Sequence, residues 1–158
     1  SPTDTAMLRA RAKTEYVHRL HKDALVIGAD QVCYLGGLLM GKPTSEIEWL
    51  DRLRLLKGKD HLLSTAVCIA YPSSKERIEF VETTSIRFRD SLSDDDLRRY
   101  VELGEAKNCA GGYMMEKRGA WLIESIQGDW QNVIGLPIFP LLRHLKELGM
   151  PCFGANNV

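Results

Sequence analysis

The amino-acid sequence predicts an α/β fold in which helices flank a mixed sheet. Apolar runs of strand length and segments with helical spacing follow one another without strict alternation, which argues against a purely parallel, doubly wound sheet. Two pairs of apolar runs are joined by turn-like segments and therefore predict β-hairpins. The length of 158 residues suits one domain with a core of its own.

The first half of the chain shows helix and strand patterns in turn. Residues 3–22 repeat apolar side chains at helical spacing. The apolar run ALVIGA over 24–29 predicts a strand that is buried on both faces. Gly36 and Gly37 predict the turn of a hairpin between VCYL and LLM. A second helix is expected over 44–56, since a serine and a glutamate stand at capping-box spacing at its start.

The second half of the chain continues with both kinds of element. Residues 61–71 and 77–89 predict two long strands, and the linking segment YPSSKE has the composition of a turn. A serine and three aspartates predict the start of a helix over 93–104. A further strand is expected over 120–126 and a last helix over 137–148, which begins with a proline.

The composition argues against several classes of protein. The 21 basic and 21 acidic residues leave no net charge, whereas proteins that bind nucleic acid usually carry a basic excess. No apolar run approaches the roughly 20 residues that span a bilayer, and the N-terminal segment lacks the apolar core of a signal peptide. The four cysteines are scattered singly, without zinc-ligand spacing. We therefore expect a cytoplasmic protein with neither a nucleic-acid nor a membrane partner.

An aspartate directly after the first apolar strand is the sharpest chemical feature. Asp30 follows this strand in the segment GADQV, and ligands of open α/β sheets usually bind beyond the carboxyl ends of strands. A carboxylate at such a place can hold a divalent cation or take a proton from water. On the residues alone, Asp30 can equally well end the strand without a chemical role.

Three further segments are weaker indications on their own. Lys42, in the tripeptide GKP before a capped helix, can reach a phosphate, although a solvated turn lysine is the commoner explanation. The segment CAGGYMME contains two glycines that let backbone approach a ligand closely, and it ends at Glu116. The loop GDWQNVIGLP precedes the last helix, and we expect its Trp130 to be buried rather than to stack on a base.

These segments, in this order, resemble the Maf family of nucleoside-triphosphate pyrophosphatases. The shared features are GADQV, GKP, RFR followed by LSDDDLRRYV, CAGGYMMEKRG and ESIQGDWQNVIGLP, and they run from about Ala24 to Leu148. The resemblance implies the fold of the inosine-triphosphate pyrophosphatases, with an elongated sheet and a cleft between two lobes. It also implies hydrolysis of a nucleoside triphosphate between the α and β phosphates, a divalent cation (Mg²⁺ or Mn²⁺) and a homodimer.

The resemblance also assigns roles to particular residues. Asp30 matches the catalytic proton acceptor, which lies close to the metal, and Lys42 matches a lysine on the phosphate side. Gln31 and Glu116, together with Cys109, match the subgroup that hydrolyses 7-methyl-GTP. A carboxylate only accepts hydrogen bonds, and guanine presents two N–H donor groups on one edge, so Glu116 suits guanine. The 7-methylated base is also cationic, which favours a nearby carboxylate.

The resemblance does not include the N-terminal part of the family pattern. The family begins with a strand and a Ser-x-Ser-Pro-Arg loop that grips phosphates, followed by a glutamate near the metal, and the sequence that starts at Ser1 contains none of these. We therefore expect residues 1–158 to form a single Maf-like domain that lacks its N-terminal strand and phosphate-gripping loop. Two alternatives stay open: the substrates dTTP and UTP, and a non-catalytic nucleotide-binding module.

Overall fold

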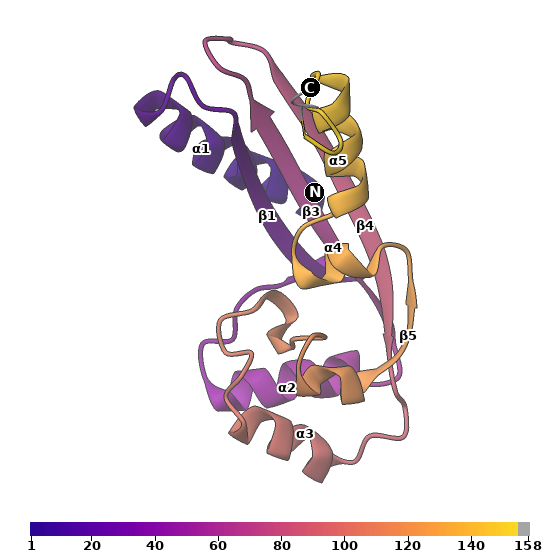
Figure 1. The fold of residues 1–158 in the computed structure, drawn as a ribbon. Coiled ribbons are helices and arrows are strands. Elements are labelled where there is room, and N and C mark those ends of the chain that lie inside the picture. Colours follow the sequence, from indigo (N-terminus) through magenta and orange to yellow (C-terminus); the bar gives the residue numbers. More distant parts are fainter. Residues whose placement is uncertain (155–158) are drawn as a thin grey trace.

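The structure, a computed structural model, describes residues 1–154 and contains a five-stranded sheet (Figure 1). The strands are β1 (Val26–Leu35), β2 (Leu38–Met40), β3 (Asp60–Ala70), β4 (Arg77–Phe88) and β5 (Ile123–Gln127). They lie in the order β2-β1-β3-β4-β5, and each pair of neighbours is antiparallel. The α/β fold is confirmed, but within the described residues the sheet is antiparallel rather than mixed, because hairpins join β1 to β2 and β3 to β4.

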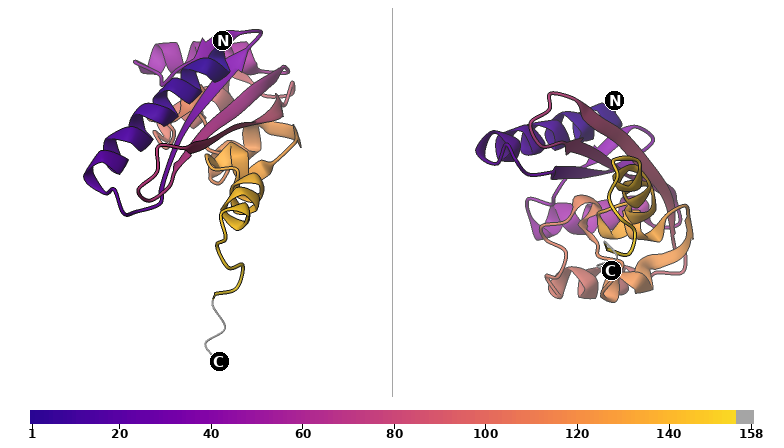
Figure 2. Two further views of the ribbon diagram at one scale, coloured as in Figure 1. Left: turned by 90° about the horizontal axis from the view of Figure 1, so that it is seen from above. Right: turned by 45° about the horizontal axis from the view of Figure 1, so that its top comes forward.

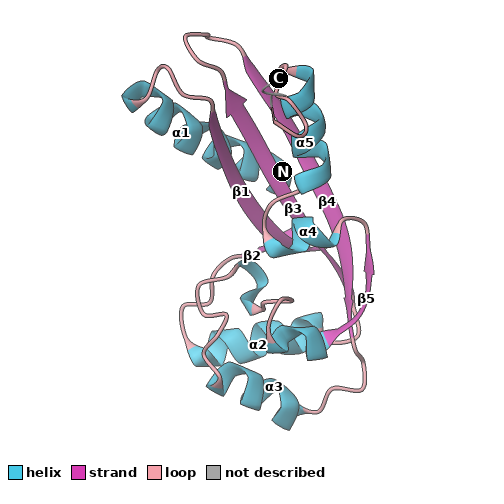
Figure 3. Ribbon diagram, in the orientation of Figure 1, coloured by secondary structure: helices cyan, strands magenta, loops and turns pink. Residues whose placement is uncertain are grey.

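Helices cover both faces of the sheet and form a second lobe at one end of it. The helices are α1 (Pro2–Leu20), α2 (Glu46–Leu56), α3 (Asp94–Glu102), α4 (Trp130–Ile134) and α5 (Ile138–Glu147), with 3₁₀ turns η1 (Ala110–Gly112) and η2 (Arg118–Leu122). Figure 2 shows α1 and α5 on opposite faces of the long strands. Below them, α2, α3 and the 3₁₀ turns make the second lobe (Figure 3). No helix within residues 1–154 combines the length and the apolar character needed to cross a membrane.

Small side chains let α1 lie close against the sheet. Ala6, Ala10 and Thr14 are buried on its inner face. Opposite them lies Gly28 of β1, where an added Cβ would stand only 2.1 Å from Thr14 Oγ1. The Thr14 hydroxyl lies 2.9 Å from the carbonyl oxygen of Ala10 and 3.1 Å from that of Cys68. This close packing fixes which residues of α1 face β1.

The second lobe has an apolar core that continues into the ends of β3 and β4. The buried side chains of its two helices are Trp49, Leu53 and Leu56 of α2 and Leu97, Tyr100 and Val101 of α3. They form one cluster with Phe88 at the end of β4. The predicted capping residues hold both helix starts, since the Ser45 and Ser93 side chains each accept a backbone hydrogen bond three residues on. The positions of α2 and α3 are therefore set by local sequence signals and by shared burial.

Several predicted details of the elements are wrong. β1 does not stop before Asp30 but continues to Leu35. It continues because β3 pairs with the backbone along nearly all of this length, whatever the side chains. Residues 118–122 form a 3₁₀ turn, so β5 is shorter and later than the strand expected over 120–126. The side chain of Trp130 is 53% exposed rather than buried.

A buried histidine lies where the two lobes meet. His61 of β3 is 1% exposed, and its Nε2 lies 2.8 Å from the hydroxyl of Tyr113. The rings of Phe88 and Tyr113 both pack edge-on against the imidazole. Burial lowers the pKa of His61 from its usual 6.5 to about 4.

This shift predicts a loss of stability in acid. Between about pH 6.5 and pH 4 the unfolded chain binds a proton at His61 and the folded chain does not, so the free energy of unfolding falls as the pH falls. Across this range His61 lowers the free energy of unfolding by about 3 kcal/mol in total. Urea unfolding measured across this range should depend less on pH in His61→Gln than in the wild type. The exposed His21 provides the control, and equal pH slopes in the wild type, His21→Gln and His61→Gln would contradict the prediction.

Candidate active site

A pocket of about 360 Å³ lies where α1, the β1–β2 hairpin and η1 meet. Asp30 and Lys42 both line it. The hairpin brings them together, because it turns back after Leu35 and pairs Cys33 with Met40, two residues before Lys42. Gln31 lines the pocket as well, so three of the predicted site residues share it, two on β1 and one just beyond β2.

Cations from α1 surround the carboxylate of Asp30. Its side chain is 14% exposed. Lys13 Nζ lies 2.5 Å from Asp30 Oδ1 and also donates to the carbonyl oxygen of Ala29 at 3.0 Å. Arg9 Nη1 lies 3.7 Å from Asp30 Oδ2. This second carboxylate oxygen is buried and has no hydrogen-bond partner among the described residues. Lys13 thus holds the carboxylate through Oδ1, while Oδ2 can still accept a hydrogen bond or a proton.

Sequence reasoning missed Lys13 and Arg9. The two residues stand four apart on α1, so they occupy neighbouring positions on one side of that helix. The only signal in the sequence is this spacing, which solvated surface pairs share. What singles these cations out is the packing of α1 on β1, which turns them toward Asp30.

Gln31 faces away from Asp30. Neighbouring side chains of a strand point to opposite faces of the sheet. The Gln31 amide donates to Thr65 Oγ1 at 3.0 Å and to the backbone carbonyl of Asn132 at 2.5 Å. Its side-chain nitrogen therefore ties β1 to α4, on the sheet face opposite α1.

The Cys109 thiol is influenced by the charges of both Lys42 and Glu116, the residue predicted to recognise the base. Burial is the main cause that raises the pKa of the Cys109 thiol, and the negative charge of Glu116 raises it further. The positive charges of Lys117 and Lys42 act in the opposite direction. Glu116 itself is exposed and does not line the pocket of Asp30. Of Lys42, Cys109 and Glu116, only Lys42 lines the pocket of Asp30.

Comparison with known proteins identifies the family. The sequence model of the family described as "Maf-like protein" matches residues 1–148. This chain belongs to the Maf family. A relative from Akkermansia muciniphila is 38% identical over 148 residues, which are 94% of this chain and 77% of the relative. A relative from Thermococcus kodakarensis is 39% identical over 149 residues, with the same shares. Both relatives carry the name dTTP/UTP pyrophosphatase.

These matches confirm the predicted family and the prediction of a hydrolase. They do not support the narrower assignment to the 7-methyl-GTP subgroup. A third relative, from Deinococcus radiodurans, is 37% identical over 153 residues, 97% of this chain and 77% of its own length, and is also named dTTP/UTP pyrophosphatase. The names of these relatives therefore differ from the base that was predicted from Gln31 and Glu116.

In this Maf protein, three buried aromatic residues anchor the loop that carries Glu116. Trp49 Nε1 donates to the carbonyl oxygen of Gly112 at 2.6 Å, and the backbone N–H of Met114 donates to the Tyr100 hydroxyl at 3.0 Å. Tyr113, between them, bonds to His61 as described above. Gly112 has φ +75°, and a Cβ there would stand 2.6 Å from Trp49 Nε1, so glycine is required. Hydrogen bonds of three successive residues thus hold the loop in place, although Glu116 itself reaches solvent.

The residues of the pocket fit a weakly held divalent cation rather than a closed metal site. Among residues 1–154, no group of three or more His, Cys, Asp or Glu side chains is arranged to hold a metal ion. One carboxylate oxygen of Asp30 is nevertheless buried and unpartnered. Mg²⁺ is commonly bound through one or two carboxylates, with waters and substrate phosphates completing its shell. Asp30 can supply such a ligand to this Maf protein.

Proposed function

We propose that this Maf protein hydrolyses a nucleoside triphosphate between the α and β phosphates, releasing a monophosphate and pyrophosphate. The observation that carries the proposal is the Asp30 carboxylate, which lines a pocket with Lys42 and has one oxygen free to accept. The cations Arg9 and Lys13 stand beside it. A carboxylate that can accept a proton, with cations nearby that offset phosphate charge, suits the attack of water on a triphosphate.

Each group has a defined part in this reaction. Asp30 orients a water molecule and accepts its proton as the oxygen attacks the α phosphorus. The bond from that phosphorus to the bridging oxygen breaks, and the electron pair leaves with pyrophosphate. Lys42 and Arg9 offset the negative charge of the phosphates. A divalent cation, Mg²⁺ or Mn²⁺, held by Asp30 would neutralise further phosphate charge.

For the base, we propose dTTP and UTP as the first substrates to test, because the relatives named above are dTTP/UTP pyrophosphatases. A second candidate is 7-methyl-GTP, which the resemblance at Gln31 and Glu116 implies and which the acceptor chemistry of Glu116 favours. Glu116 can only accept hydrogen bonds, whereas uracil and thymine place two carbonyls around a single N–H. The family also suggests a homodimer and a cytoplasmic location, which stay predictions; light scattering of the purified chain tests the first.

Pyrophosphate release from a panel of triphosphates, with Mg²⁺ or Mn²⁺, tests the proposal. We expect release from dTTP and UTP that depends on the added cation. Release mainly from 7-methyl-GTP would favour the second candidate. Binding of triphosphates without release from any of them would contradict the enzymatic proposal and favour the non-catalytic module.

Glu116→Gln tests the contribution of that residue to the choice of base. An amide can donate as well as accept, so this change should raise the ratio of pyrimidine to guanine turnover by about tenfold, the effect of one charged hydrogen bond. The ratio of kcat/KM for UTP and 7-methyl-GTP measures it. Glu102→Gln, at an exposed glutamate of α3, is the matched control. An unchanged ratio in Glu116→Gln would reject a role for this residue in base recognition.

A further inference from the structure

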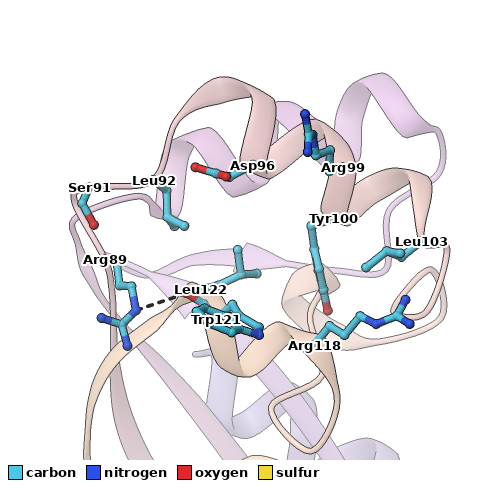
Figure 4. A pocket seen from close by; sticks show the side chains of 10 residues that line it. All are labelled: Arg89, Ser91, Leu92, Asp96, Arg99, Tyr100, Leu103, Arg118, Trp121 and Leu122. Carbon is cyan, nitrogen blue, oxygen red and sulfur yellow. Dashed lines mark hydrogen bonds between the residues drawn. The ribbon is translucent and has the colours of Figure 1, made fainter.

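A second, larger cavity lies on the lobe formed by α2 and α3, between α3 and η2. Its volume is about 660 Å³, within the range of small-molecule sites. It shares no lining residue with the pocket of Asp30 and Lys42. Figure 4 shows its walls, with α3 on one side and Trp121 of η2 on the other. Nothing in the proposed reaction uses this cavity.

The indole ring of Trp121 is exposed to solvent at this cavity. The side chain of Trp121 is 79% exposed, although its chain neighbour Leu122 is buried in the core of the lobe. Tyr100 of α3 extends toward the same space (Figure 4). A flat ring placed on Trp121 would remove apolar surface of both partners from water. Stacking of a base on an aromatic side chain is favourable for every base.

The three arginines that line the cavity differ in whether their guanidinium groups already have partners. Arg89 is held by the carbonyl oxygen of Trp121 at 3.1 Å and by Glu124 at 3.2 Å. Arg118 makes no hydrogen bond or ion pair with any side chain in the described part of the protein. Arg99 pairs with Asp95 at 2.8 Å, and Figure 4 shows it directed away from Trp121. Arg118 is therefore the cation best placed to receive an anion.

The cavity also offers a hydrogen-bond acceptor, the carboxylate of Asp96. Asp96 lines the cavity across from Trp121. One of its carboxylate oxygens is occupied by the backbone N–H of Ser93 at 2.8 Å and by the Ser93 hydroxyl at 2.6 Å. The other oxygen has no hydrogen-bond partner within residues 1–154. A ligand for this cavity thus needs a flat ring, one anionic group and a hydroxyl or amino donor.

We propose that this cavity is a second binding site, which takes a mononucleotide. The base stacks on Trp121, the phosphate pairs with Arg118, and a ribose hydroxyl or base amino group donates to Asp96. A nucleotide supplies all three chemistries within a volume of this size, whereas a bare phosphate supplies one. The inference does not depend on the proposed activity at Asp30.

Titration of the ¹⁵N-labelled full chain with uridine monophosphate tests the site through the indole N–H resonance of Trp121, assigned with Trp121→Phe. We expect the Trp121 resonance to shift as the nucleotide is added and the shift to saturate. Arg118→Ala should weaken binding about tenfold or more, the effect of one charge-assisted hydrogen bond. Arg99→Ala, which removes the arginine that points away, is the matched control and should bind as the wild type does. Uridine and inorganic phosphate should each bind at least about tenfold more weakly than the nucleotide.

Three results of the titrations with nucleotide and phosphate would overturn the proposal. These are an unmoved Trp121 resonance at millimolar nucleotide, equal affinity in Arg118→Ala and Arg99→Ala, and equal affinity for phosphate alone. A shift caused by an acidic peptide but not by the nucleotide would also overturn it, in favour of a protein-docking site. The same titration of Asp30→Asn should give the wild-type shift, so the outcome is separate from that of the proposed hydrolysis.

Discussion

Replacing Asp30 by asparagine should lower kcat for triphosphate hydrolysis by about 10²- to 10⁴-fold, the usual contribution of a positioned general base. The amide has nearly the shape of the carboxylate but cannot accept the proton of water at neutral pH. It also removes the negative charge that Lys13 and Arg9 now contact at 2.5 Å and 3.7 Å. The loss should therefore appear mainly in kcat, while the nucleotide still binds.

Steady-state kinetics of pyrophosphate release, with the best substrate of the panel, measure this effect. Asp95→Asn is the matched control, because Asp95 is an exposed residue of α3 whose only ion pair within residues 1–154 is with Arg99. Thermal unfolding of both variants separates a catalytic loss from misfolding. Turnover close to the wild-type value in a folded Asp30→Asn protein would contradict the proposed role of the carboxylate.

Gly28→Ala is expected to have the largest effect on stability, about 2–5 kcal/mol. The new Cβ would lie 2.1 Å from Thr14 Oγ1 and 2.9 Å from the backbone carbonyl oxygen of Ala10. If Thr14 turns away, its hydroxyl leaves the carbonyl of Cys68 without that contact in the core. If the helix moves instead, α1 shifts on β1 and takes Lys13 away from the site.

Urea unfolding followed by circular dichroism tests this prediction. Gly41→Ala is the control, because a Cβ at that position meets nothing within 4 Å and its backbone carries no positive φ. The double variant Gly28→Ala/Thr14→Ala should recover part of the loss, because it removes the nearer of the two obstacles. Equal stability of Gly28→Ala and Gly41→Ala would show that α1 does not pack on β1 as described.

Local signals in the sequence are enough to predict most elements and the hairpin that brings Asp30 and Lys42 into one pocket. Ser93 and the aspartates after it start α3, and the two glycines at 36 and 37 turn the β1–β2 hairpin. Such signals act over a few residues, so they can be recognised without knowledge of the fold. Asp30 and Lys42 come together for the same reason, since a single hairpin lies between them.

Other features depend on contacts between distant segments, and only the folded chain settles them. Lys13 reaches Asp30 because buried Ala10 and Thr14 bring α1 close to Gly28, which no periodicity in the sequence reveals. Pairing with β3 extends β1 through a polar pair of residues and thereby sends Gln31 to the face opposite Asp30. The side chains of a segment are known from its sequence, but which of them meet depends on packing between elements far apart in the chain.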